Sequence, residues 1–166
     1  MIQRKQHLFL AAIFLISLTM IIGNMNITKG LIQTATDQFD KGYYYSVNIM
    51  DKVITFETET SQTNNNGTIY SLLIVTLIAF ITIFLFKKRE IQLRLVAFNF
   101  LFIVLFWFNL FFSVYKLNKG ETTKLISSDL NYLTLSLPLI LLVLNFLALK
   151  GIKKDIELLA SVNRFR

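Results

Sequence analysis

The stretch FLFKKREIQLRL, residues 84–95, places four basic side chains and one glutamate between two apolar runs. Burying one charged side chain at the centre of a bilayer costs on the order of 3 kcal/mol on insertion scales. The charges therefore mark where two hydrophobic segments end. Because so few residues separate the two runs, the stretch predicts a tight connection between two antiparallel membrane helices.

Four apolar runs without Asp, Glu, Lys or Arg lie along the chain on both sides of this connection. A bilayer core of about 30 Å needs roughly 20 helical residues, and three of the runs are long enough. The first run is shorter, and we expect it to extend to about residue 25. We also expect it to remain as a span, because no small-x-small cleavage pattern follows it. The predicted transmembrane helices are residues 7–25, 69–86, 95–115 and 132–149.

The basic residues are distributed unequally between the two sides of such a membrane protein. Most of the 17 Lys and Arg lie in the two terminal segments and in residues 87–94. The positive-inside rule then places both termini in the cytoplasm. Tyr70, Tyr115 and Tyr132 lie at the opposite ends of the predicted spans, where an amphipathic ring is favoured. We therefore expect a multi-pass membrane protein with both termini on the cytoplasmic side.

These features predict an all-α membrane protein with four transmembrane helices in an antiparallel bundle, forming a single membrane domain over residues 1–166. The outer loop, residues 26–68, is expected to hold a small extracytoplasmic subdomain. Apolar residues at four-residue spacing predict a short helix within 28–40. Aromatic and β-branched residues in 43–50 and 53–60 indicate a possible β-hairpin.

Three further segments outside the spans have their own signals. The consecutive Tyr43, Tyr44 and Tyr45 are interpreted as interfacial anchors rather than as a contact surface. The sequence NNNG at 64–67 is typical of a flexible return to the next span. The basic tail, residues 150–166, is amphipathic, which favours a helix that lies along the lipid headgroups or continues the last span into the cytoplasm.

Composition narrows the functional classes. Hydrophobic residues make up 54% of the 166 residues, above the roughly 45–50% of ordinary soluble domains. The absence of Cys excludes disulfide exchange and thiolate metal sites, and one His leaves no evident ligand set for a metal or cofactor. The net charge of +7 is better explained by contact with anionic lipid headgroups than by nucleic acid. We expect a non-enzymatic protein without a cofactor.

Two pairs of polar residues fall inside the predicted spans. Asn99 and Asn145 lie at similar depth, and Asn109 and Ser136 lie nearer the outer end. A cross-helix hydrogen bond contributes about 0.5–2 kcal/mol, so we expect interhelical polar contacts. Pro138 can bend the last helix. The alternative to a structural role is a small transporter or channel with a polar path near Asn99, Asn145 and Pro138.

Three short segments carry a likeness to a known family. They are MIQRKQ at residues 1–6, FKKREIQLRL at 86–95, and the tail from IKKD at 152–155 to RFR at 164–166. Together they resemble a family of small tetraspan inner-membrane proteins of the Bacteroidota, known only as a domain of unknown function. The tail departs from the family's usual Lys-Asp-Glu by having Asp-Ile-Glu at 155–157. The resemblance implies a four-span layout and no established activity.

The resemblance also implies that the three segments meet at the cytoplasmic end. We interpret them as a cytoplasmic plate of amide, basic and acidic side chains that either closes the bundle through its own bonds or docks a partner. The leading hypothesis is a scaffold or accessory subunit in contact with the lipid bilayer, its anionic headgroups and another membrane protein. The candidate residues of the plate are Gln3, Arg4, Gln6, Arg89, Gln92, Arg94, Lys153, Asp155, Arg164 and Arg166.

Overall fold

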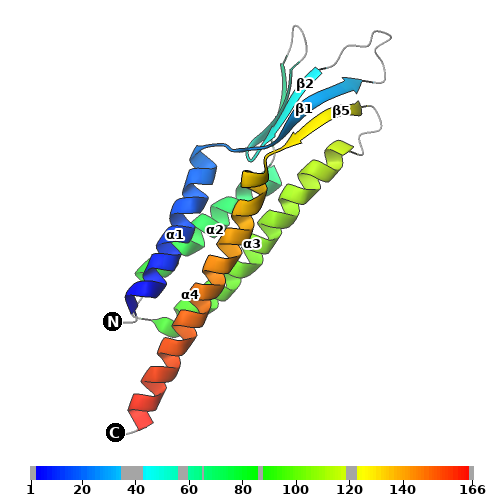
Figure 1. Ribbon diagram of the computed structural model, residues 1–166. Helices are drawn as coiled ribbons and strands as arrows, with labels where there is room; N and C mark the ends of the chain where they lie inside the picture. Colours follow the sequence, from blue (N-terminus) through cyan, green and yellow to red (C-terminus); the bar gives the residue numbers. More distant parts are fainter. Residues whose placement is uncertain are drawn as a thin grey trace.

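The computed structural model of the chain describes residues 3–34, 43–55, 60–64, 66–85, 88–118 and 123–164. Four helices pack side by side as a helical stem, with α1 on α2, α2 on α3, α3 on α4, and α4 back on α1 (Figure 1). Both termini lie at the end of the stem opposite the strands (Figure 1). The helices are α1 (Gln3–Ile22), α2 (Asn66–Phe84), α3 (Arg89–Asn118) and α4 (Tyr132–Arg164).

Three of these helices, α2, α3 and α4, are long and apolar enough to cross a membrane. The apolar part of α1, Gln6–Ile22, is shorter. At 1.5 Å per residue it reaches about 25 Å, slightly less than the core of a typical bilayer. The predicted extension of the first span to residue 25 is wrong, because the helix ends at Ile22 and the chain turns at Gly23 and Asn24.

The outside of the stem is apolar and its interior is packed. Phe98, Phe108 and Phe146 are largely exposed, whereas Phe106 and Leu141 are fully buried. Soluble monomers rarely expose continuous apolar patches above a few hundred Å². Such a surface fits contact with lipid chains, because contact between phenylalanine and hydrocarbon carries no unfavourable free energy of transfer.

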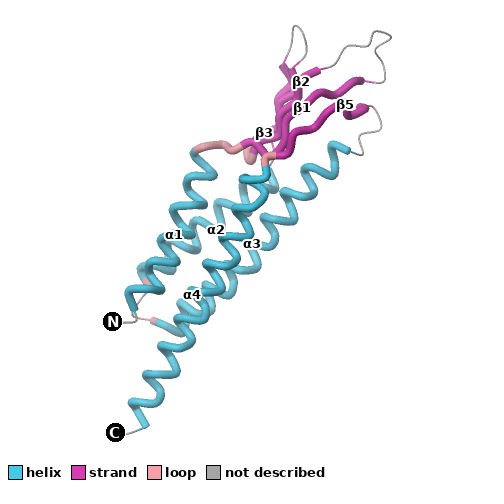
Figure 2. Tube along the Cα trace, in the orientation of Figure 1, coloured by secondary structure: helices cyan, strands magenta, loops and turns pink. Residues whose placement is uncertain are grey.

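A five-stranded antiparallel sheet stands at the other end of the stem, so the protein is mostly helical, as predicted, but it is not all-α (Figure 2). The strand order is β4-β3-β2-β1-β5. β5 comes from the connection between α3 and α4, and it pairs with β1, which follows α1. The strands are β1 (Asn26–Thr34), β2 (Tyr43–Asn48), β3 (Asp51–Thr55), β4 (Thr60–Asn64) and β5 (Thr123–Leu130).

The predicted short helix within 28–40 is also wrong over its described part, because residues 26–34 form β1. An isolated helix of that length is marginal, and Gly30 near its start lowers helix propensity further. β1 instead pairs with β2 on one side and β5 on the other, which satisfies both edges of its backbone. Residues 35–40 lie outside the described part of the chain.

The predicted hairpin is present as β2 and β3, paired from Tyr44 opposite Thr55 to Val47 opposite Lys52. The flexible return predicted at 64–67 is wrong for its first residue, since Asn64 ends β4 and pairs with Asp51. Asn66 and Gly67 already belong to α2. β5 had no counterpart in the sequence-based prediction.

Hydrogen bonds at the end of α1 attach the sheet to the stem. Asn24 adopts a φ of 36°, a conformation that Asn tolerates better than most residues. Its Oδ1 accepts from the Met50 N–H at 3.0 Å, and its Nδ2 donates to Asp51 Oδ1 at 3.2 Å. Asn48 Nδ2 donates to the same carboxylate oxygen at 2.8 Å. The β2–β3 turn is therefore held directly against the end of α1.

A second attachment lies where β5 enters α4. The Asn131 N–H donates to the Ile27 carbonyl at 3.0 Å, and Asn131 Oδ1 caps α4 by accepting from the Thr134 N–H at 3.4 Å. Thr134 Oγ1 donates to the Asn26 carbonyl at 2.8 Å. The sheet is thus fixed to the stem at two points rather than suspended on a loop.

Candidate functional site

Two regions of the molecule carry the polar groups from which a functional site can be built. One is the end of the stem near the termini, where the predicted cytoplasmic plate lies. The other is the exposed face of the sheet. They lie at opposite ends of the molecule (Figure 1).

At the first end, three residues of the plate are buried: Gln6, Gln92 and Asp155. We call these three residues and Arg89 the basal cluster. Arg89 Nη1 lies 3.9 Å from Asp155 Oδ2 and donates to the Asp155 carbonyl at 3.5 Å, which links the start of α3 to α4. Gln92 Nε2 donates to the Thr82 carbonyl at 3.3 Å. That bond ties α3 to the last turn of α2, the helix that precedes it in the chain.

Gln6 contributes to the basal cluster through close packing. Its side chain is 5% exposed and lies against Gly151 of α4. A Cβ added at Gly151 would lie 2.8 Å from Gln6 Cγ, so α1 and α4 approach each other closely only because residue 151 is glycine. Gln6 Nε2 is buried without a hydrogen-bond partner.

The remaining plate residues are not gathered into this cluster. Arg94 and Lys153 are exposed on α3 and α4. Gln3 and Arg4 belong to the first turn of α1. Arg164 lies nine residues beyond Asp155 on α4, about 14 Å along the helix. Arg166 lies outside the described residues, and the last turns of α4 project beyond the rest of the stem (Figure 1).

Within the stem, the structure brings Asn99 and Asn145 together. Asn99 Nδ2 donates to Asn145 Oδ1 at 3.5 Å, and Asn145 Nδ2 donates to the Val96 carbonyl at 3.0 Å. Both amides are fully buried between α3 and α4, and Asn99 Oδ1 has no hydrogen-bond partner. This arrangement fits a contact that fixes the two helices relative to each other.

Asn109 and Ser136 are not brought together. Asn109 Nδ2 donates to the Leu105 carbonyl of its own helix at 2.9 Å. Ser136 Oγ likewise donates to the Leu133 carbonyl at 2.9 Å. Asn109 Oδ1 instead approaches Gly67, where an added Cβ would lie 3.0 Å away. Pro138 is buried, and α4 continues through it.

The sheet has one buried and one exposed face. Tyr45 is 3% exposed and Val47 is buried, and both belong to the hydrophobic core. The end of α3 contacts β1 and β5. Tyr44 is 70% exposed on the opposite face. The three consecutive tyrosines therefore do not share one anchoring role, because adjacent residues of a strand point to opposite faces.

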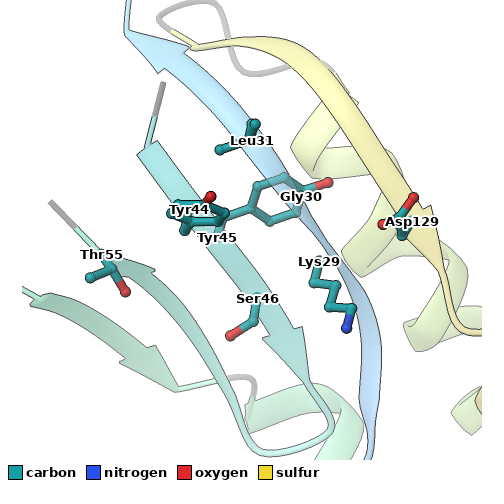
Figure 3. A pocket seen from close by; sticks show the side chains of 8 residues that line it. All are labelled: Lys29, Gly30, Leu31, Tyr44, Tyr45, Ser46, Thr55 and Asp129. Carbon is teal, nitrogen blue, oxygen red and sulfur yellow. The ribbon is translucent and has the colours of Figure 1, made fainter. Parts of the chain in front are cut away.

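The exposed face is hollowed into a cavity of about 480 Å³ (Figure 3). Two rows of side chains cross it. Asp129, Lys29 and Ser46 stand opposite one another on β5, β1 and β2. Leu31, Tyr44 and Thr55 form the neighbouring row on β1, β2 and β3. The lining is completed by Gly30 and Tyr45.

Sequence reasoning missed this cavity, although it considered the three tyrosines. Asp129 and Lys29 are 100 positions apart, and nothing local to either residue indicates that they face each other on neighbouring strands.

Outside the cavity, burial lowers the pKa of Lys52 on β3. Among the described residues, no three His, Cys, Asp or Glu side chains gather in a way that could hold a metal ion. The cavity itself is lined by an aromatic ring and by charged and hydroxyl side chains, which suit it to non-covalent binding by stacking and hydrogen bonds.

A comparison with family models confirms that the chain belongs to a family described as a domain of unknown function. A family model described as "Domain of unknown function (DUF4293)" matches residues 2–165, so the chain belongs to this family. No curated protein matches the sequence.

Proposed function

We propose that this member of the DUF4293 family is a non-enzymatic protein of the bacterial inner membrane that serves as a scaffold or accessory subunit of a larger membrane complex. In this proposal all four helices cross the bilayer, with both termini in the cytoplasm and the sheet outside. The short α1 crosses with its neighbours, because modest local thinning of the bilayer costs only fractions of a kcal/mol per Å.

The observation that carries the proposal is the fixed attachment of the sheet to an apolar stem. Asp51 accepts from Asn24 and Asn48 at one junction, and Thr134 donates to Asn26 at the other. These bonds define the orientation of the exposed sheet face relative to the helical stem. A surface held in one orientation loses less conformational entropy when it docks, which suits a scaffold.

The transporter alternative depends on the polar groups inside the stem. Its best support is the unpartnered Oδ1 of Asn99. However, Asn145 bonds both Asn99 and the Val96 carbonyl, and these groups lie among buried residues such as Ile103 and Ala148. Interhelical bonding accounts for the two asparagines without a path for solute, so we favour the scaffold.

The orientation can be tested with single cysteines, because the chain contains none. Thr55 on the sheet and Ser161 near the end of α4 are both exposed. In intact spheroplasts, a membrane-impermeant maleimide should label T55C and should label S161C only after the membrane is opened. Labelling of S161C in closed spheroplasts would refute the proposed orientation.

The scaffold role can be tested by site-specific photo-crosslinking in living cells followed by purification in mild detergent and mass spectrometry. The photoreactive residue is placed at the exposed Lys153 and Arg94, and at the buried Gln92 as a matched control. We expect one recurrent membrane-protein partner from at least one exposed position and none from Gln92. A protein that always emerges without a partner would contradict the proposal.

A further inference from the structure

The exposed sheet face combines an aromatic ring with mixed polar groups. Tyr44 lies at its centre on β2, flanked by Leu31 and Thr55 as its direct cross-strand neighbours (Figure 3). Side chains at directly opposed positions have Cβ atoms about 4.5–5.5 Å apart. The neighbouring row lies two residues along the strands, roughly 7 Å away. The Tyr44 ring is thus framed by hydrogen-bonding groups within reach of one small ligand.

The charges in this cavity compensate each other. Lys29 stands directly opposite Asp129, so one cation and one anion border the same space. A site for a free phosphate would be expected to concentrate cations without a facing carboxylate. The hydroxyl groups of Ser46 and Thr55 add uncharged hydrogen-bond donors and acceptors. The lining therefore fits a neutral ligand that carries several hydroxyl groups.

A sugar ring meets both requirements of the cavity. One face of a pyranose presents C–H groups that pack on an aromatic ring, while its edge presents hydroxyl groups to carboxylate, ammonium and hydroxyl side chains. The volume of about 480 Å³ lies within the range of about 300–1,000 Å³ typical of small-molecule sites. An added peptide strand would pair along a free sheet edge, whereas most of this site lies on the face of the inner strands β1, β2 and β3, and only Asp129 comes from the edge strand β5.

A second cavity connects this face to the stem. It measures about 450 Å³ and shares Lys29 and Asp129 with the first. From these two residues it extends to Tyr132 and Leu133 at the start of α4, both largely exposed. If α4 crosses the bilayer as proposed above, Tyr132 lies at the level of the lipid headgroups. The two cavities adjoin at Lys29 and Asp129, and their lining residues together extend from Tyr132 to Tyr44.

We infer that the exposed sheet face binds the saccharide headgroup of a membrane glycolipid. The sugar stacks on Tyr44 and bonds with Asp129, Lys29 and Ser46. Its lipid portion leaves past Tyr132 and Leu133 into the outer leaflet. The inference rests on the membrane insertion in the proposed function, but it concerns a lipid ligand and is independent of any protein partner.

The test is a lipid titration of the full-length protein followed by native mass spectrometry. The protein is purified in an amine oxide detergent, because alkyl maltosides themselves carry a sugar headgroup. Monoglucosyl diacylglycerol and phosphatidylglycerol are titrated separately. We expect the glycolipid to bind at least tenfold more tightly. Equal affinity for the two lipids would overturn the inference.

Variants of Tyr44 test the stacking contact. Because Tyr44 is 70% exposed, its replacement removes little core packing. We expect Tyr44→Ala to weaken glycolipid binding about tenfold and Tyr44→Phe to retain most of it. Tyr70→Ala, which removes another largely exposed ring near the start of α2, is the control and should bind as the unchanged protein does. Unchanged binding by Tyr44→Ala would overturn the inference.

A competition experiment separates a lipid-borne sugar from a soluble one. Methyl glucoside at the concentration of the bound glycolipid should not displace it, because it lacks contacts along Tyr132 and Leu133. Displacement at equal concentration would show that the lipid portion contributes nothing and would overturn that part of the inference. Loss of glycolipid binding by Tyr44→Ala with retention of the crosslinked protein partner would separate this site from the scaffold role.

Discussion

Replacing Gly151 by alanine tests the close approach of α1 and α4. Alanine is better than glycine inside a helix by about 1 kcal/mol, so a change without tertiary consequence would stabilise α4. However, the new Cβ would lie 2.8 Å from Gln6 Cγ. This atom is near the backbone of a buried side chain and has little room to move, and overpacking of this kind costs about 1–3 kcal/mol. We therefore expect Gly151→Ala to destabilise the protein by up to about 2 kcal/mol.

The double variant Gln6→Ala/Gly151→Ala should reverse this loss. Removing Gln6 Cγ relieves the clash, and it also removes the buried Nε2 that has no hydrogen-bond partner. The coupling between the two changes should be at least about 1 kcal/mol. Unfolding in mixed micelles containing SDS, followed by the fluorescence of the single tryptophan, Trp107, gives the free energies. A stabilised Gly151→Ala, or purely additive effects, would refute the close contact.

Three further changes test other parts of the fold. Asn145→Leu should cost about 1–2 kcal/mol in the same assay by leaving the Asn99 amide without its partner, whereas the double variant with Asn99→Leu should be nearly neutral. Asp51→Ala removes the acceptor shared by two asparagines, so amide hydrogen exchange of β2 and β3 should accelerate while that of α3 stays unchanged. Because burial lowers the pKa of Lys52, the unfolded chain binds more protons there than the folded protein at pH values between the lowered pKa and the ordinary value of 10.5. The free energy of unfolding should therefore rise as pH increases above the lowered pKa. Lys52→Met should abolish this dependence on pH. An unchanged pH dependence in Lys52→Met would contradict the desolvation of Lys52.

The apolar helices could be located from the sequence with few errors. Three of the predicted segments coincide with α2, α3 and α4, which have the length and composition to cross a membrane. The errors lie at the ends of helices, where contacts with residues distant in the chain also decide the outcome. Asn24, for example, ends the first helix early because it takes a positive φ and bonds to Met50 and Asp51.

The polar residues show a similar division. The likeness to the family led to the prediction that Gln6, Gln92 and Asp155 belong to the cytoplasmic plate, and the structure buries all three. Their contacts could not be predicted, because each depends on a neighbouring helix: Gln92 on Thr82, and Gln6 on Gly151. Arg164 was predicted to belong to the same plate, yet α4 continues as a helix and carries this residue away from the basal cluster.

By itself, the sequence determined which segments are apolar helices and where the charges interrupt them. Those properties follow from the transfer free energies of neighbouring residues, which can be summed along a short window of the sequence. The sheet was decided only by the tertiary structure. β1 becomes a strand because β2 and β5 lie on either side of it, and β5 is so distant in the chain that Thr28 bonds the Asp129 carbonyl across 101 positions. Hydrogen bonds between strands depend on which segments meet in space, and that meeting is set by the packing of the four helices.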